Sequence, residues 1–472
     1  MPDALSAIVM AAGKSTRFKS QHSKLAHPLL GKSIIERVIE TLGKLSPQPK
    51  VYVVVGHCGD EVRSCLTQHS VLFVVQEPQL GTGHCVQMAL NQIPEQAGRV
   101  LIINGDIPLI SVQVFQNLLD TQTKRRAALT LVSTRLKEPA GYGRVLKNRS
   151  GQVMRVVEDR DATPAQRRIR EINVGIYAAG LADLKRLIPR LSNQNAQQEY
   201  YLTDLIEIFN KAKKKVATLL VEDSRQVLGA NDRAELAALE QILRETKLLD
   251  LMRSGITLID PRTTSIDEDV QIGADTVIYP GVRIEGRSTL GSGCVVRSHS
   301  RITNSIIEDD VIINDLSVIN ESHVARGATI GPFTHLRLNA EIGSRARVGN
   351  FVEVKKTKLG KGAKASHLTY LGDAFIGDET NVGAGTITCN YDGETKNQTV
   401  VGEGCFIGSG VELVAPVTIG AGAYVAAGSV VTEDVPPQSL AVARSRQVNK
   451  LDWKKKRKRE VRDDSKIPIP TK

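Results

Sequence analysis

The first residues that could do chemistry form a short glycine-containing loop after an apolar stretch. Residues 5–12 are mostly apolar, Gly13 and Arg17 follow, and Lys24 stands seven residues beyond Arg17. Small residues let backbone N–H groups close around a phosphate, and a following helix points its positive end at that phosphate. Arg17 and Lys24 can stabilise the charge that builds on phosphate oxygens in a transition state. An ordinary tight turn is the alternative, because the loop matches neither GxxxxGK[ST] nor GxGxxG.

A carboxylate stands directly after a second apolar run. Asp106 follows Asn104 and Gly105, and these three residues come immediately after the run 100–103. The carboxyl ends of parallel strands are where α/β domains bind ligands. A carboxylate there can hold Mg²⁺, which takes oxygen ligands and bridges phosphates. The alternative is an aspartate that only caps a turn.

A histidine lies among polar residues in the second half of the chain. His367 follows Arg337 and Lys355 and precedes Tyr370 and Asn381. Histidine as a residue type suits general base catalysis, for example the removal of a proton from an attacking amine. A single histidine is more often structural, but the polar and basic residues around His367 favour the role of a base.

The framework indicated by the first half of the chain is an α/β domain. Short apolar runs alternate with helix-like spacing, the runs at 51–55, 71–75 and 100–103 and the helix-like segments at 33–45, 82–92 and 112–120. Continuous apolar strands between helices predict a mostly parallel sheet covered on both faces. Residues 231–254 contain neither Pro nor Gly and predict one connecting helix. We therefore expect a Rossmann-like domain over 1–232 and a linker helix over 233–254.

The second half follows a period of six residues. Aliphatic residues recur in three registers, at Ile266, Ile272, Ile278, Ile284, Leu290, Val296 and Ile302, at Ile306, Ile312, Val318, Val324, Ile330, Leu336, Ile342, Val348 and Val354, and at Val401, Ile407, Leu413, Ile419, Val425 and Val431. This period fits a parallel β-helix, in which each hexapeptide forms one flat side of a triangular coil. We expect a left-handed parallel β-helix over 255–472 with these side chains inside. The register is interrupted between Val354 and Val401, and loops that interrupt a scaffold often bind ligands.

Composition and charge limit the class of protein. The chain has 472 residues, of which 41% are hydrophobic and 24% charged, and its net charge is +11. The run 454–462 holds seven basic residues and one acidic residue. Such a run is more often a solvated tail than a reader of nucleic acid, and we expect no nucleic-acid partner.

The cysteines and the hydropathy pattern bear on location. The six cysteines include no CxxC pair, which favours a reducing compartment. The first apolar run has no basic leader, and no stretch reaches membrane-spanning length. We therefore expect a cytoplasmic protein without a membrane span.

The motifs of the first half together resemble those of the sugar nucleotidyltransferases. They are Gln-x-x-x-x-Gly-Thr-Gly at 76–83, Gly-Asp-x-Pro-Leu at 105–109, Gly-Tyr-Gly-Arg at 141–144, Glu-Ile-Asn-x-Gly at 171–175 and Glu-Tyr-Tyr-x-Thr-Asp at 199–204. Within that group, nearly the whole chain resembles the bifunctional family of N-acetylglucosamine-1-phosphate uridylyltransferases and glucosamine-1-phosphate N-acetyltransferases.

This resemblance implies the chemistry and the residues of a first site. UMP would pass from UTP to N-acetylglucosamine-1-phosphate with release of pyrophosphate, and Asp106 and Asn231 would hold Mg²⁺. Arg17 is the catalytic candidate of this half. The residues implied to bind the nucleotide and the UDP-sugar are Met10, Ala11, Ala12, Gly13, Lys24, Gln76, Gly81, Thr82, Asn104, Gly105, Asp106, Gly143, Glu158, Asn173 and Asn231.

The segment 367–393 resembles the acetyltransferase half of the same family, which implies a second site. Acetyl-CoA would acetylate glucosamine-1-phosphate with His367 as general base. Arg337 and Lys355 would bind the sugar phosphate, and Tyr370 and Asn381 would contact the sugar. The residues implied to meet acetyl-CoA are Ala384, Asn390, Tyr391, Ser409, Ala427 and Arg444. The family also implies a homotrimer with acetyl-CoA bound between neighbouring β-helices.

Several positions depart from the family pattern. Ser15 stands where the pattern has a second Gly, and Ser23 replaces the Pro of a Pro-Lys pair. Asn104 replaces a Tyr, and Leu338-Asn339 replaces Pro-Gly beside Arg337. These departures concern the loop, the contact at residue 104 and one corner of the predicted β-helix.

Two alternative functions remain. The chain could be a nucleotidyltransferase whose β-helix only regulates or oligomerises, but such a solenoid would not need His367 and its polar partners. It could also be a scaffold or nucleic-acid-binding protein that uses its basic tail, which would leave the Gly105-Asp106 pair unexplained.

Overall fold

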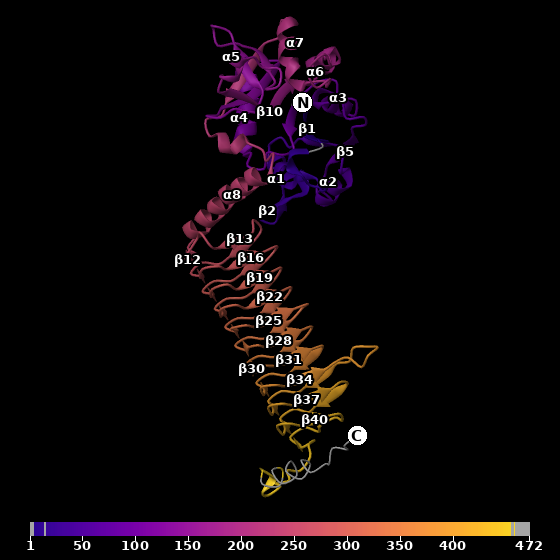
Figure 1. Ribbon diagram of the computed structural model, residues 1–472, viewed down its shortest axis with the longest axis vertical. Helices are drawn as coiled ribbons and strands as arrows, with labels where there is room; N and C mark the ends of the chain where they lie inside the picture. Colours follow the sequence, from indigo (N-terminus) through magenta and orange to yellow (C-terminus); the bar gives the residue numbers. More distant parts are fainter. Residues whose placement is uncertain (1–3, 14–15, 455–456, 458–472) are drawn as a thin grey trace, which may run out of the picture. The chain divides into compact units, whose positions relative to one another are not determined.

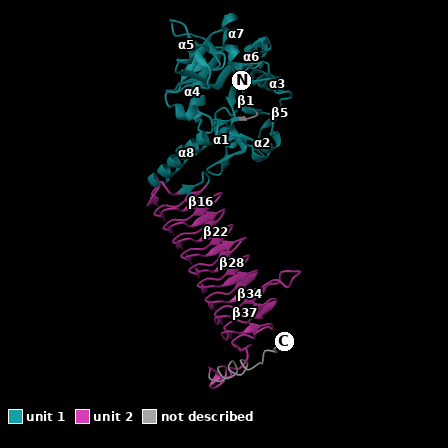
Figure 2. Ribbon diagram, viewed as in Figure 1, with its two compact units in different colours: residues 1–253, 265–269 teal, residues 254–264, 270–472 magenta. Residues whose placement is uncertain are grey.

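The computed structural model describes residues 4–13, 16–454 and 457. The chain divides into two compact units (Figure 2). Residues 1–253 with 265–269 form unit 1, and residues 254–264 with 270–472 form unit 2. Most of the predicted basic tail, and Ser15, lie outside the described residues.

Unit 1 is built on one sheet with the strand order β11-β7-β10-β6-β1-β4-β5. The strands are β1 (Leu5–Ala11), β4 (Lys50–Val55), β5 (Leu72–Val75), β6 (Arg99–Asn104), β7 (Leu129–Arg135), β10 (Glu171–Gly180) and β11 (Val216–Leu220). Strand β1 pairs in parallel with β4 and β6, whereas β10 is antiparallel to both β6 and β7. The hairpin β8 (Arg144–Lys147) and β9 (Val153–Val157) extends this sheet next to β10. The prediction of a mostly parallel α/β sheet is confirmed.

Helices cover both faces of this sheet, because its strands bury apolar side chains on each side. The α-helices of unit 1 are α1 (Ile34–Gly43), α2 (Gly59–Cys65), α3 (Thr82–Leu90), α4 (Val112–Arg125), α5 (Pro164–Arg167), α6 (Leu181–Leu187), α7 (Leu205–Lys211) and α8 (Arg233–Arg253), of which the short α5 buries no residue. Helix α1 begins with a capping box in which Ser33 and Glu36 satisfy each other's backbone N–H groups. Within the described residues, none of the helices combines the length and apolar character that a membrane crossing demands.

Unit 2 is a parallel β-helix, as the hexapeptide period predicts (Figure 1). Its coils stack three parallel sheets of very short strands. One sheet runs from β12 (Thr257–Leu258) to β41 (Leu440–Ala441), the second ends at β40 (Val430–Val431), and the third runs from β14 (Gln271–Ile272) to β38 (Val417–Ile419). The aliphatic residues of the repeat fill the interior, for example Ile284, Ile330 and Ile407, which are all fully buried.

The predicted register is wrong over part of the repeat. Ile306 and Ile312 are 54% and 39% exposed, and their neighbours Ile307 and Ile313 point inside instead. Val318 is likewise replaced inside by Ile319. The reason is that two corners, 302–307 and 319–324, advance the inward position by five residues instead of six. Because adjacent residues here are both aliphatic, the period alone could not show which of each pair is buried.

The predicted interruption between Val354 and Val401 is also mostly wrong. Inward residues continue through Leu359, Ala365, Leu371, Ile376 and Val382, all buried, so the coils are unbroken there. The only excursion in this stretch of described chain lies at 390–398, between β34 (Ile387–Cys389) and β35 (Thr399–Val401). The period of six was not recognised here because further corners advance the inward position by five residues and because the inward residue at 365 is a small alanine.

Candidate functional site

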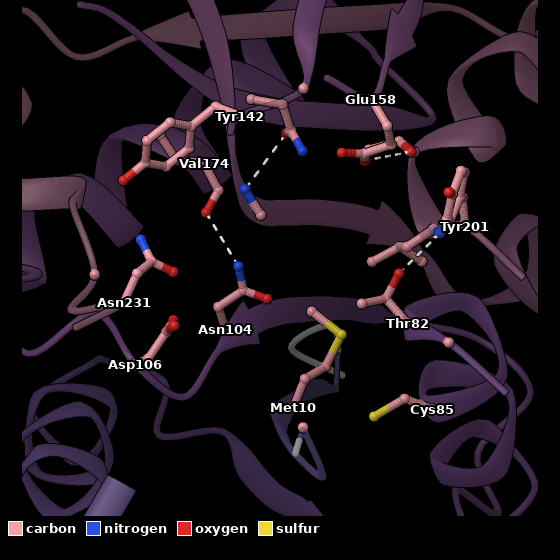
Figure 3. A pocket seen from close by; sticks show the side chains of 18 of the residues that line it. Met10, Thr82, Cys85, Asn104, Asp106, Tyr142, Glu158, Val174, Tyr201 and Asn231 are labelled. Carbon is pink, nitrogen blue, oxygen red and sulfur yellow. Dashed lines mark hydrogen bonds between the residues drawn. The ribbon is translucent and has the colours of Figure 1, made fainter. Parts of the chain in front are cut away.

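A cavity of about 1030 Å³ opens at the carboxyl edge of the unit 1 sheet (Figure 3). Strands β1 and β6 place Met10 opposite Asn104 in the register, and β10 adds Asn173 next to them. The predicted residues that line the cavity are Met10, Ala11, Ala12, Gly13, Arg17, Lys24, Gln76, Gly81, Thr82, Asn104, Asp106, Gly143, Glu158, Asn173 and Asn231. Gly105 is the exception, since it is buried behind the wall and its N–H donates to the Met10 carbonyl at 3.0 Å.

Two cationic side chains contact the predicted metal ligands. Lys24 Nζ is 2.5 Å from Asp106 Oδ2 and also donates to the Ala230 carbonyl at 3.2 Å. The Arg17 guanidinium donates to Asn231 Oδ1 at 2.7 Å. Figure 3 shows Asp106 and Asn231 on the same side of the cavity. This side of the cavity therefore combines oxygen ligands with positive charge, the combination that a metal-bound polyphosphate requires.

Other parts of the cavity wall carry polar groups held in fixed positions. Glu158 Oε1 accepts a hydrogen bond from Thr203 Oγ1 at 2.9 Å, and burial raises the pKa of the Glu158 carboxyl. Asn173 is buried and donates to Tyr177 Oη at 2.8 Å. Because these side chains are already hydrogen-bonded, they can present defined polar contacts to a sugar without further ordering.

The motif at 76–83 forms the start of α3 and its preceding turn. Gln76 is buried, and its Nε2 lies 3.0 Å from the Gly81 carbonyl and 3.1 Å from His84 Nδ1. Gly81 has φ +104°, in a region that side chains disfavour, and a Cβ there would meet the backbone of Tyr200. Thr82 Oγ1 accepts the Leu202 N–H at 3.1 Å. The turn is therefore tied to the segment at 199–204.

The departure at residue 104 has a structural partner. Asn104 Nδ2 donates to the Val174 carbonyl at 3.4 Å (Figure 3), and Gly175 follows with φ +78°. A Cβ on Gly175 would overlap the Asn104 side chain. Asn104 thus fits against a glycine in the wall of the cavity.

Sequence reasoning missed some lining residues that lie inside the quoted motifs. Tyr142 and Tyr201 both line the cavity, and burial raises the pKa of each phenol, that of Tyr201 to about 12. Arg160 also lines it, in a segment without a motif. The tyrosines were visible as motif positions, but nothing in the sequence showed that their rings turn inward.

Unit 2 carries a second cluster, which is basic. Arg337 and Lys355 are register partners on β25 (His335–Arg337) and β28 (Glu353–Lys355). Arg337 pairs with Glu353 at 2.7 Å. Lys355 is buried, and its pKa is lowered chiefly by the Lys396 ammonium beside it and then by burial. Cations that repel each other in this way form a site prepared for an anion such as a phosphate.

Sequence reasoning did not identify Lys396, because it lies on the excursion at 390–398. Asp392 fixes this loop by accepting the N–H groups of Glu394 and Thr395 at 2.9 and 2.7 Å and the Asn397 amide at 2.8 Å. These bonds, with that of the Thr395 hydroxyl, hold the pKa of the Asp392 carboxyl far below its usual range. The loop thus has a defined shape that keeps Lys396 near Lys355.

The predicted sugar-contact residues lie in two places. Tyr370, on β31 (Tyr370–Gly372), folds its ring over Gly372, which is the register partner of Lys355. Tyr370 therefore joins the basic cluster. Asn381 is on β33 (Asn381–Val382) in a different sheet, where its register partner is Lys364.

His367 ends β30 (Lys364–His367) and is exposed. Its Nδ1 lies 2.6 Å from Oδ1 of Asn350, its register partner one coil earlier. An amide oxygen only accepts hydrogen bonds, so in the neutral imidazole this contact places the proton on Nδ1 and leaves Nε2 as the nitrogen that can accept one. The contact thus orients the ring for the role of a base. Asn350 stands seventeen residues before His367 and was not predicted.

The small residues predicted to meet acetyl-CoA lie along one corner of the β-helix. Ala384, Ser409 and Ala427 each precede a glycine with φ between +66° and +75°. The N–H of Gly410 donates to the Ala384 carbonyl at 2.7 Å, and that of Gly428 donates to the Ser409 carbonyl at 2.9 Å, so these corners stack. The Gly385 N–H donates to the Leu368 carbonyl at 3.0 Å, which links this edge to the corner of His367. The result is a narrow edge of small side chains that begins next to His367.

Of the other three predicted acetyl-CoA residues, Asn390 and Tyr391 lie on the next corner of the coil, between β34 and β35, and Arg444 lies near the C-terminal end of this edge. The Asn390 side-chain amide donates to Asp373 Oδ2 at 2.5 Å, and Tyr391 is exposed on the excursion with its hydroxyl donating to the Gly393 carbonyl. Arg444 is exposed and passes beside Gly428. Their roles as ligands of acetyl-CoA stay predictions.

The departure at Leu338-Asn339 leaves the corner intact. Both residues have positive φ, +51° and +62°. Asparagine tolerates this conformation better than most side chains, which explains how it replaces the glycine of the pattern. Arg337 keeps its ion pair with Glu353.

Comparisons with known proteins agree with this arrangement. Residues 7–172 match the MobA-like NTP transferase domain, and residues 269–304 and 398–433 match the bacterial transferase hexapeptide (six repeats). The chain is 44% identical to the bifunctional protein GlmU of Trichlorobacter lovleyi over 448 residues, which are 95% of this chain and 97% of that protein.

Two further relatives are similar over the same span. The bifunctional protein GlmU of Geotalea uraniireducens is 45% identical over 96% of this chain and 99% of its own length. That of Brevibacillus brevis is 43% identical over 97% of this chain and 99% of its own length. The chain therefore belongs to the family of the bifunctional protein GlmU, which confirms the resemblance of its motifs.

Proposed function

We propose that this chain makes UDP-N-acetylglucosamine in two steps at two separate sites. Unit 2 acetylates glucosamine-1-phosphate with acetyl-CoA, and unit 1 then joins the product to UMP from UTP and releases pyrophosphate. The observation that carries this proposal is that each unit has a site of its own. Unit 2 has His367, held by Asn350, and a basic cluster, and unit 1 has a cavity lined by oxygen ligands and cationic side chains. We assign nucleotidyl transfer to residues 1–232 and acetyl transfer to residues 255–472, with α8 as the linker.

In the acetyl transfer, the phosphate of the sugar binds between Arg337, Lys355 and Lys396. Nε2 of His367 removes a proton from the sugar ammonium or from the attacking amine, and the amine nitrogen attacks the thioester carbonyl. The C–S bond then breaks, the acetyl group stays on nitrogen, and CoA leaves as a thiolate that is protonated to the thiol. Transfer is direct, so Cys389 need not form an acyl intermediate.

In the nucleotidyl transfer, an oxygen of the sugar phosphate attacks the α-phosphorus of UTP, and pyrophosphate leaves. Arg17 and Lys24 exchange their contacts with Asn231 and Asp106 for phosphate oxygens and stabilise the charge of the transition state. Glu158 and Asn173 hold the sugar, and Gln76 and Thr82 hold the nucleotide. Positioning accounts for most of this catalysis, because no covalent enzyme intermediate is needed.

The oxygens of Asp106 and Asn231 are suitable ligands for Mg²⁺, which prefers carboxylate and amide oxygens and completes its shell with water and phosphate. When bound, Mg²⁺ would neutralise phosphate charge and orient the triphosphate. In the structure Lys24 contacts the Asp106 carboxylate and balances its charge, while Arg17 donates to the neutral amide oxygen of Asn231. Both oxygens thus already receive a cationic side chain, which supports the choice of Asp106 and Asn231 as ligands.

We also propose a cytoplasmic location, because the six cysteines include no CxxC pair, and a homotrimer. Its support is a line of exposed apolar corner residues on unit 2, namely Leu316, Phe333, Phe351 and Leu368, which are 45%, 46%, 56% and 62% exposed. Phe333 and Phe351 stack with 5.2 Å between ring centroids. Exposed apolar patches of this kind mark protein contacts. Light scattering should give three times the chain mass for the wild type and less for Phe351→Asp.

The experiment that tests the function is an assay of the purified chain with glucosamine-1-phosphate, acetyl-CoA, UTP and Mg²⁺. We expect free CoA, pyrophosphate and UDP-N-acetylglucosamine. Omission of UTP should leave CoA release intact, and N-acetylglucosamine-1-phosphate should replace the first two substrates. If CoA is never released, the β-helix is only regulatory. If removal of 454–472 abolishes both activities, the basic tail is more than a solvated end.

A further inference from the structure

The loop that carries Arg17 and Lys24 is tied to α2 by its residues 21–23. Glu61 in the first turn of α2 accepts the Ser23 N–H at 2.7 Å with Oε2, and its Oε1 lies 3.1 Å from His22 Nδ1. The thiol of Cys58, at the start of the same helix, donates to the Gln21 carbonyl at 3.5 Å. Three consecutive residues directly before Lys24 are therefore held from one helix.

Among these contacts, the bond from Ser23 is the shortest. The Ser23 N–H is the main cause of a lowered pKa of Glu61, ahead of the His22 side chain, which shows that the bond favours the ionised carboxylate. His22 is 76% exposed, so solvent screens its part of the interaction. The short bond from a backbone N–H to a carboxylate is of the charge-assisted kind.

The conformation of Ser23 is one that a proline ring would fix. Ser23 has φ −59° and ψ 129°, which are values that proline adopts. Serine has no such ring, and its backbone N–H, which a proline would lack, is the group that donates to Glu61. The Glu61 carboxylate therefore holds a backbone shape that the Ser23 side chain does not fix.

Lys24 begins the 3-10 helix η2 (Lys24–Ala26) immediately after this point. Its ammonium must reach both Asp106 and the Ala230 carbonyl, which fixes where the backbone at residue 24 must lie. Because Ser23 directly precedes Lys24, the φ and ψ of Ser23 set the direction in which η2 starts. The Ser23 hydroxyl adds only a local cap, since it accepts the Leu25 N–H at 3.3 Å.

We propose that Glu61 is a positioning residue for nucleotidyl transfer: it holds the backbone of Ser23 in the conformation that a proline ring would fix and so sets Lys24 against the triphosphate. The proposal rests on the proposed uridylyl transfer in unit 1. It assigns to α2 a role that no motif of the chain indicates.

The test is the rescue of a Glu61 variant by proline. Glu61→Ala should raise the KM for UTP about tenfold, the effect of losing one charge-assisted hydrogen bond that keeps the loop in its binding conformation. Because bound UTP brings Lys24 back into place, kcat should stay within about threefold. Glu61→Ala combined with Ser23→Pro should return the KM to within about twofold of the wild type, since the ring fixes φ without the N–H. A merely structural role of Glu61 would not be repaired by proline at another position.

The controls use the same chain. Asp60→Ala removes the neighbouring exposed carboxylate of α2, and Ser23→Ala removes the cap but keeps the N–H, so both should leave the KM for UTP within about threefold. CoA release by unit 2 and the melting temperature report folding for every variant.

The outcomes separate this proposal from the proposed function. If the wild type forms no UDP-sugar, the assigned function fails. If the wild type is active but Glu61→Ala keeps its KM, or if the double variant stays as impaired as Glu61→Ala, the positioning role is overturned.

Discussion

Replacement of Lys396 by methionine tests the phosphate site of unit 2. The Lys396 ammonium lies beside Lys355 and is the main cause of the lowered pKa of that lysine. An incoming phosphate removes this repulsion and gains a contact with each cation. Methionine keeps much of the length of the side chain and removes only the charge, so the loop held by Asp392 should stay folded.

The size of the effect follows from exposure. A hydrogen bond to a charged group contributes about 1.5–3 kcal/mol. Lys396 is exposed, so we take the lower end, about 1.5 kcal/mol, which corresponds to roughly a tenfold weaker affinity. The KM for glucosamine-1-phosphate should rise by about that factor, while kcat should change by less than about threefold, because the base and the thioester are untouched.

The assay is steady-state release of the CoA thiol at varied glucosamine-1-phosphate. Inorganic phosphate serves as a competitive inhibitor that probes the anion site alone, and its inhibition constant should rise in parallel with the KM. Lys361→Met, at an exposed corner of the same β-helix, is the matched control. An unchanged KM together with unchanged inhibition by phosphate would refute the assignment of Lys396 to the phosphate site.

Three other predictions concern unit 2. Asn350→Ala should lower kcat for acetylation about fivefold, less than His367→Ala, because it removes one hydrogen bond that orients the base; equal losses would contradict this. Ile307→Ala should destabilise unit 2 by about 2–5 kcal/mol and Ile306→Ala by less than about 0.5 kcal/mol, measured by chemical denaturation. Asp392 has a lowered pKa, so its stabilisation of the loop is present above the ordinary aspartate pKa of about 3.9 and is lost as the pH falls through the folded value. The loop should therefore stay ordered between about pH 8 and 5, and the KM for glucosamine-1-phosphate should not rise from loop disorder in that range. Asp392→Ala should raise this KM over the whole range.

The sequence predicts both folds because each has its own period. Apolar runs between helices predict a buried parallel sheet, and they correspond to β4, β5 and β6. The hexapeptide period predicts the β-helix, but it does not resolve corners of five residues, and so Ile306 was placed inside in error. Adjacent aliphatic residues carry no information on which one faces inward.

The residues of the two sites also fall into those that the sequence predicts and those that it does not. Asp106 and His367 could be predicted because they stand at recognisable places, after a strand and within a motif. Asn350 could not, since its contact with His367 depends on the stacking of two coils. Lys396 lies on an irregular loop, and Glu61 acts through a backbone N–H, which has no counterpart in residue type. What sequence patterns omit is therefore the second layer of contacts that holds the predicted residues.

The central claim is that one polypeptide holds two independent transferase sites, and it is tested most directly by measuring both activities in two variants. Asp106→Ala should lose UDP-sugar formation and keep CoA release at the wild-type rate. His367→Ala should lower CoA release by about 10²–10⁴-fold and keep UDP-sugar formation from N-acetylglucosamine-1-phosphate. If either folded variant loses both activities or neither, the two sites are not those described.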